Sequence, residues 1–249
     1  MKKMGRAFLM SLSMFTVIPL KLRGWDESLR PLMTLCLPFV GIVTGGLWAG
    51  TALLLGCLSV PPLLGAAVLA AFPFLITGGI HLDGFMDVTD AVRSWREPEE
   101  RRRILKDPHV GSFAVAFTVL LVLFQFAAFA SFGEETELFS LLLIAVVSRC
   151  AAAVCVTVLR PMSMSEYAGT YRKGIRRPHL IFLLAVLAAA VLAGFLFLGR
   201  YGLVSAAVLA GYAVFVIRAF RSLGGMSGDV SGYAMTAAEL CGVICLALL

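Results

Sequence analysis

The sequence predicts an all-α polytopic membrane helix bundle, a single domain with about seven transmembrane spans. Of its 249 residues, 60% are hydrophobic and 14% are charged, and the mean hydropathy is +0.93. Soluble domains are about 45–50% apolar and roughly 25% charged. The apolar runs are continuous and about 20 residues long, as membrane-spanning helices are, whereas barrel strands are shorter and alternate. These observations exclude soluble, fibrous and disordered proteins.

The first segment, 1–20, joins a basic tip to an apolar run that is too short to span a bilayer core about 30 Å thick. It lacks a small-residue cleavage site, so we predict a retained interfacial or re-entrant helix. The segments long and apolar enough to span are 32–58, 63–80, 110–132, 138–159, 180–198, 202–217 and 231–249.

Charges between these spans alternate from one connection to the next. The net charge is +6, and the basic residues concentrate in 21–30, 93–106, 160–178 and 218–229, whereas 133–137 is acidic. Basic loops of membrane proteins stay in the cytoplasm. The sequence therefore predicts a multi-pass protein of the cell inner membrane, with 81–109, 160–178 and 218–230 on the cytoplasmic side. The basic excess is explained without nucleic acid.

Small residues inside the apolar segments indicate packing. Gly41 and Gly45, and then Gly46 and Gly50, have the spacing that lets membrane helices approach closely. The six cysteines lie in apolar stretches without a C-x-x-C motif or a neighbouring histidine, so we interpret them as buried apolar side chains.

Three carboxylates follow a glycine pair at the end of the second span. Asp83, Asp87 and Asp90 have i, i+4, i+7 spacing, which places them within about 60° on one helical face. Like charges at this spacing repel each other, but Mg²⁺ or Mn²⁺ would bind them together with substrate phosphates. The alternatives are a solvated acidic face or, for Asp83, a helix N-cap. His81 lies two positions before Asp83. It is either a functional group of the same site or an interfacial polar residue.

Two further features could contact phosphate. Lys106 precedes a helix start at Asp107, and it either binds phosphate or anchors the membrane face. The glycine-rich turn at 224–229 offers the backbone of Gly225 and Gly228 to an anion. Asp229 is a metal ligand or an N-cap.

Two charges lie inside apolar spans. Arg149 is near the middle of the fourth span, where an uncompensated charge is costly, so it should face the bundle and meet a carboxylate or an anionic substrate. Glu239, in the last span, should also face the bundle for the same reason. The loop at 167–174 is basic and contains glycines, so we expect it to cover a phosphorylated substrate, with Arg172 as one of its cations.

The chain resembles the cobalamin synthase family, also called adenosylcobinamide-GDP ribazoletransferases, in strings that occur in the expected order. These are FTVIP at 15–19, GIHLDG at 79–84 with Asp87 and Asp90, Lys106-Asp107 with Gly111, the Arg149 span and GGMSGD at 224–229. The chain departs from the family pattern at two places, Ala91 where glycine is usual and Met226-Ser227 where Val-Thr is usual.

The resemblance implies a magnesium-dependent transfer late in vitamin B12 biosynthesis. A hydroxyl of α-ribazole, or of its 5′-phosphate, attacks the cobinamide-linked phosphorus of adenosylcobinamide-GDP; GMP leaves and adenosylcobalamin, or its 5′-phosphate, forms. On this basis Asp83, Asp87 and Asp90 are metal ligands with Asp229, and one motif carboxylate or His81 is the general base. Phosphate contacts fall to Lys106, Arg149, Arg172, Gly225 and Gly228.

Two other functions compete with this interpretation. A CDP-alcohol phosphotransferase uses related acidic-helix chemistry, but its pattern requires two further aspartates that do not follow Asp90 here. A secondary transporter would place its carboxylates in the middle of the membrane, whereas the carboxylates of this chain are expected at the cytoplasmic edge. Membrane lipid is an expected partner, nucleic acid is not, and a homo-oligomer remains open.

Overall fold

Helices form nearly all of the computed structural model, which describes residues 2–22, 24–133, 135–162 and 177–249. The all-α prediction is confirmed for these residues. The elements are α1 (Lys2–Phe15), η1 (Glu27–Leu29), α2 (Arg30–Cys57), α3 (Pro62–Ile76), α4 (Ile80–Arg93), α5 (Pro98–Ile104), α6 (Ser112–Ala130), α7 (Ser140–Val158), α9 (Arg177–Leu198), η2 (Gly199–Gly202), α10 (Leu203–Leu223) and α11 (Gly228–Leu248).

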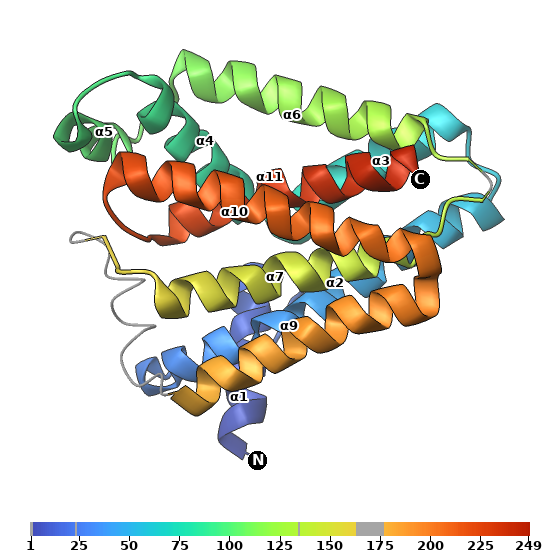
Figure 1. The fold of residues 1–249 in the computed structure, drawn as a ribbon, viewed down its shortest axis with the longest axis horizontal. Coiled ribbons are helices and arrows are strands. Elements are labelled where there is room, and N and C mark those ends of the chain that lie inside the picture. Colours follow the sequence, from blue (N-terminus) through green and yellow to red (C-terminus); the bar gives the residue numbers. More distant parts are fainter. Residues whose placement is uncertain (1, 23, 134, 163–176) are drawn as a thin grey trace.

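Each predicted span corresponds to one of the helices α2, α3, α6, α7, α9, α10 and α11. In the described part of the chain, five helical segments are long and apolar enough to cross a membrane, or six when the bent pair of α3 and α4 is one span. One of the five, Arg177–Leu223, turns back at η2 and contains both α9 and α10 (Figure 1). About seven spans is therefore consistent with the structure.

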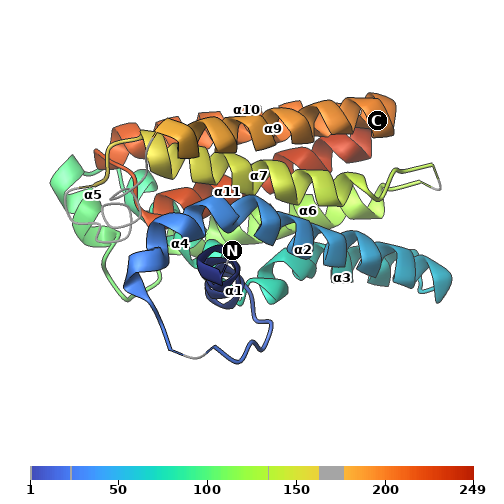
Figure 2. The same cartoon turned by 90° about the horizontal axis from the view of Figure 1, so that it is seen from below.

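The long helices run lengthwise through the molecule, with α7 in the middle (Figures 1 and 2). In α7, 78% of the most apolar window is buried, against 11% in the stretch of α9 and α10. Gly41 and Gly45 of α2 lie directly against α7 at Ala145 and Leu142, which confirms their predicted packing role. By contrast, a Cβ on Gly50 would have no neighbour within 4 Å.

The predicted glycine break separates α3 from α4. The two helix axes meet at 89°, and the turn needs the left-handed backbone of Gly78 (φ 62°) and Gly79 (φ 80°), which only glycine adopts readily. The Gly79 N–H donates to the Phe74 carbonyl at 2.9 Å and so closes the end of α3. Consequently α4 leaves the line of α3 and packs along α11.

The helices α4 and α11 cross at Gly84. A Cβ on Gly84 would lie 2.9 Å from the backbone Cα and O atoms of Asp229, so no larger side chain fits without separating the helices. We expect Gly84→Ala to lower the free energy of unfolding by about 1–3 kcal/mol through overpacking, measured by thermal unfolding in detergent micelles. Gly50→Ala, in open space on α2, is the control and should be neutral or slightly stabilising. Equal stability of both variants would contradict the close crossing.

The motif-bearing segments gather at one end of the molecule, at the left of Figure 1. Arg102 of α5 donates from Nη1 to the carbonyl of Leu223, at the end of α10. Pro161 and Met226 form a parallel bridge between the segment after α7 and the turn before α11. At the opposite end, the Tyr201 hydroxyl donates to the Glu135 carbonyl. This arrangement matches the predicted grouping of the basic loops.

The N-terminal helix α1 packs across the bundle against α2, as Figure 2 shows from below. Its buried face includes Met10, and the Ser11 hydroxyl donates to the Met33 carbonyl of α2. Its other face carries the exposed Lys3 and Arg6. A short helix thus occurs at the predicted place, with an apolar face against α2 and an exposed basic face.

Candidate active site

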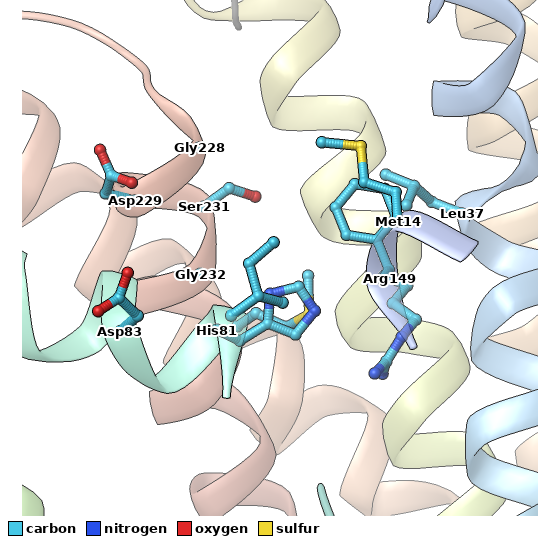
Figure 3. Close-up of a pocket in the computed structure, with 12 residues that line it drawn as sticks. Met14, Leu37, His81, Asp83, Arg149, Gly228, Asp229, Ser231 and Gly232 are labelled. Carbon is cyan, nitrogen blue, oxygen red and sulfur yellow. The ribbon is translucent and has the colours of Figure 1, made fainter. Parts of the chain in front are cut away.

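A cavity of about 280 Å³ lies where α1, α2, α4, α7 and α11 meet (Figure 3). Its lining brings together residues that are far apart in the sequence: Met14, Phe15, Leu37, Ile80, His81, Asp83, Arg149, Gly228, Asp229, Ser231, Gly232 and Met235. In Figure 3 the carboxylates lie on one side of the cavity, Arg149 lies on the other, and His81 lies between them. The cavity therefore has an acidic side and a basic side.

Asp83 and Asp229 form the acidic side. Asp83 projects from the first turn of α4 and Asp229 from the first turn of α11. Because the two helices touch at Gly84, these carboxylates lie next to each other although 146 positions separate them in the sequence. The N-cap of α11 is Ser227, whose Oγ accepts from the Val230 N–H. Asp229 is therefore not the N-cap, which removes one structural explanation for its presence.

Asp87 follows Asp83 by one turn of α4, and Asp83, Asp229 and Asp90 are all near enough to repel its charge. Within the described residues, no three His, Cys, Asp or Glu side chains form a ready-made metal cluster. Mg²⁺ commonly keeps several waters and binds one or two carboxylates together with substrate phosphates. The carboxylates thus fit a cation that arrives with a phosphate-bearing substrate, rather than a preformed protein cage.

The carboxylate of Asp90 is engaged elsewhere. Its Oδ2 accepts from the Gly111 N–H at 2.7 Å and its Oδ1 from the Ala114 N–H at 2.9 Å. These N–H groups belong to the N-terminus of α6, which has no intrahelical acceptor for them. Asp90 therefore fastens the start of α6 to α4, and its carboxylate is turned toward α6.

We expect Asp90→Ala to lower the free energy of unfolding by about 1–2 kcal/mol, since a lost helix cap has this magnitude. Asp90→Asn should lose less, because asparagine also caps helices. Thermal unfolding in micelles measures both, with Glu99→Gln as the control because Glu99 is an exposed carboxylate at the same end of the molecule. Unchanged stability of Asp90→Ala would show that the two hydrogen bonds contribute little.

His81 lies inside the cavity even though the carboxylates of α4 project from a different face. Its ring stacks on Phe15 of α1, with 6.0 Å between centroids. Its carbonyl accepts from the Thr236 hydroxyl of α11, and Gly232 packs against its backbone. His81 is thus held by α1 and α11, and its ring nitrogens make no hydrogen bond to another described residue.

Arg149 faces the bundle, as its position in the fourth span predicts, and it meets a carboxylate. Its Nη1 lies 2.8 Å from Glu239 Oε1, and both side chains are more than 90% buried. The Ser148 hydroxyl donates to the same carboxylate oxygen at 2.9 Å. All hydrogen bonds from Arg149 to described residues use Nη1. The Nε and Nη2 groups of the guanidinium therefore make no hydrogen bond to a described residue.

The glycine-rich turn brings only part of its predicted set to the cavity. Gly228, the first residue of α11, lines it. Gly225 instead lies against the backbone of Met162, where a Cβ would come within 2.4 Å of Cα. The Met226 N–H donates to the Arg160 carbonyl, and the Met226 carbonyl accepts from the Met162 N–H. Gly225 is thus needed for this close approach.

One other predicted phosphate contact is not brought to the cavity. Lys106 is exposed in the connection after α5, and it is not part of the cavity wall. Arg172, with the rest of the loop at 167–174, lies outside the described residues.

Met14 and Phe15 were not among the predicted site residues, although they form the wall opposite α4. Apolar side chains carry no chemical signature in a sequence. The sequence feature that could have identified them is their place at the end of an amphipathic helix, where Phe15 begins the FTVIP string.

Comparison with known proteins gives a consistent result over the whole chain. A family profile described as "Cobalamin-5-phosphate synthase" matches residues 7–247. A Clostridium perfringens protein named "Adenosylcobinamide-GDP ribazoletransferase" is 36% identical over 253 residues, covering 100% of both chains. Relatives with the same name from Clostridium botulinum and Geobacillus kaustophilus are each 34% identical and cover 98% and 99% of this chain and 97% of their own. No solved structure matches.

Proposed function

The chain belongs to the cobalamin-5-phosphate synthase family and is a membrane enzyme of cobalamin biosynthesis, and we propose that it joins adenosylcobinamide-GDP to α-ribazole or α-ribazole 5′-phosphate. GMP is the leaving product, and adenosylcobalamin or its 5′-phosphate forms. The observation that carries the proposal is the cavity with Asp83 and Asp229 on one side and Arg149 on the other. We place this cavity toward the cytoplasmic side of the cell inner membrane, because the basic loops gather at that end.

Asp83 and Asp229 are the proposed ligands of Mg²⁺, with Asp87 adding negative charge beside them. When bound, Mg²⁺ neutralises negative charge on the phosphates of the substrate. This assignment changes the role of one member of the predicted set. Because both oxygens of Asp90 are engaged at α6, we assign Asp90 to positioning the acidic helix rather than to the cation.

The basic side of the cavity and the start of α11 offer donors to the substrate phosphates. Arg149 has Nε and Nη2 left over from its contact with Glu239. The first N–H groups of α11, at Gly228 and Asp229, lack intrahelical acceptors and carry the positive end of the helix dipole. Phosphoryl transfer depends mainly on such positioning and charge stabilisation.

His81 is the proposed general base. It lines the cavity between the two charged sides, and its ring is held by Phe15. In the proposed step, a ribose hydroxyl oxygen of α-ribazole bonds to the cobinamide-linked phosphorus, the bond from that phosphorus to the GMP oxygen breaks, and the hydroxyl proton passes to the imidazole. Atoms and charge balance, because GMP leaves with the electron pair of the broken bond.

The purified protein in lipid nanodiscs should release GMP from adenosylcobinamide-GDP only when α-ribazole or its 5′-phosphate is present. Omission of the acceptor is the control, since hydrolysis alone would release GMP without it. GMP formation and the corrinoid product are measured together by chromatography. CMP release from a CDP-alcohol, without reaction of adenosylcobinamide-GDP, would establish the rival phosphotransferase instead.

A further inference from the structure

A second cavity, of about 260 Å³, lies on the other face of α4. Phe85 and Thr89 line it, and they are two positions after Asp83 and Asp87, which turns them about 200° around the helix. Its remaining walls come from α6, α10 and α11 and are almost entirely apolar, for example Phe117, Phe124 and Phe215. This groove is therefore separate from the cavity that holds the carboxylates.

Positive charge is concentrated at the end of the groove nearest the basic loops. Arg93 lines the groove, and its guanidinium carbon lies 4.3 Å from the centroid of the Phe117 ring. Arg218 is exposed on α10 three positions after Phe215, so it lies one helical turn from that residue of the groove wall. Among the described residues, no carboxylate forms an ion pair with either arginine. One cation thus lines the apolar groove, and a second lies one helical turn beyond its wall.

Tyr233 adds an unusual polar group to this wall. The residue is 6% exposed, and its ring packs between Phe85 and Phe215. Its hydroxyl makes no hydrogen bond to another described residue, although buried tyrosine hydroxyls usually have a partner. Thr89, 4% exposed on the same wall, also has an unpartnered hydroxyl. The Tyr233 hydroxyl is therefore available to a ligand in the groove, whereas the Thr89 hydroxyl oxygen is enclosed without a partner.

The groove opens onto an exposed apolar face of α6. Along α6 its wall includes Leu120 and Phe124, which are 45% and 57% exposed. Along α11 it continues inward as far as Ile244. An occupant therefore needs an anionic group at the arginines and a long apolar part that follows α6 and α11 into the membrane. A free phosphate has the first property and lacks the second.

We infer that this groove binds one phospholipid with an anionic headgroup, whose phosphate lies between Arg93 and Arg218 and accepts a hydrogen bond from Tyr233. One acyl chain lies along Leu120 and Phe124. The lipid packs against the face of α4 opposite to the carboxylates, so its binding is a separate event from the proposed reaction.

Retention of lipid by the full-length protein tests this inference. The protein is reconstituted in phosphatidylcholine nanodiscs with and without phosphatidylglycerol, released into detergent and analysed by native mass spectrometry. We expect one retained phosphatidylglycerol on the wild type. Arg93→Gln and Arg218→Gln should each weaken retention about fivefold, and the double variant about thirtyfold, because one cation near a lipid phosphate contributes about this much. Tyr233→Phe, which keeps the ring, should also weaken it.

Arg221→Gln is the matched control, because Arg221 is an exposed arginine at the same end of α10 but lies about 120° around the helix from Phe215 of the groove wall. It should retain phosphatidylglycerol as the wild type does. Equal losses for Arg221→Gln and Arg93→Gln would overturn the inference, as would equal retention of phosphatidylcholine and phosphatidylglycerol. Competition by millimolar inorganic phosphate without any bound lipid would show a phosphate site instead. None of these readouts depends on turnover.

Discussion

Asp83→Asn and Asp229→Asn should each lower kcat/KM for GMP release by roughly a hundredfold or more, because a cation at a reacting phosphate contributes several kcal/mol. Asparagine keeps the size of the side chain and one oxygen, and it removes the charge that holds the cation. Steady-state release of GMP across a Mg²⁺ titration measures the effect. Both variants should also need more Mg²⁺ for half-maximal turnover.

The control for this prediction is Glu99→Gln, which removes an exposed carboxylate of α5 at the same end of the molecule. It should keep the turnover and the Mg²⁺ demand of the wild type. Asp87→Asn should raise the Mg²⁺ demand, since Asp87 lies beside the other two carboxylates without lining the cavity. Normal turnover of Asp83→Asn at normal Mg²⁺ demand would end the assignment of a cation to this side of the cavity.

Arg149→Leu should destabilise the protein by about 3–5 kcal/mol, because it leaves the charge of Glu239 buried without its partner. Glu239→Leu should have a similar effect by leaving Arg149 unpaired. The double variant replaces both charges with apolar groups, and such replacements are often nearly neutral. Thermal unfolding of the three variants in micelles measures the differences.

Activity separates the two roles of Arg149. If its remaining donors bind a substrate phosphate, the double variant recovers stability and still lacks turnover. Ser148→Ala, which removes a hydrogen bond to Glu239 and keeps both charges, should retain most activity. A double variant with both normal stability and normal turnover would show that Arg149 serves only to neutralise Glu239.

The sequence predicted the fold well where one property decided the structure. Apolar length located the helices α2, α3, α6, α7, α9, α10 and α11, and the glycine pair at 78–79 located the break between α3 and α4. The direction of α4 after that break could not be predicted. It depends on the close contact between Gly84 and Asp229, and such a contact between distant segments leaves no periodic pattern in the sequence.

The candidate site was predictable to a similar degree. Helical spacing correctly placed Asp83, Asp87 and Asp90 on α4, but spacing cannot say which neighbour each side chain meets. Asp90 meets the start of α6, whereas Asp83 meets α11. The rule that a charge inside a span needs a partner predicted that Arg149 faces the bundle, and the structure supplies Glu239.

Direct binding of Mn²⁺ to the purified protein, followed by electron paramagnetic resonance, tests the central claim most directly. In the presence of adenosylcobinamide-GDP, the wild type should bind one Mn²⁺. Asp83→Asn and Asp229→Asn should bind it at least about tenfold more weakly, a difference of 1.4 kcal/mol. Asp90→Asn should bind as the wild type does, because its side chain holds α6. Undiminished binding by Asp83→Asn and Asp229→Asn, with binding lost in Asp90→Asn, would contradict the account.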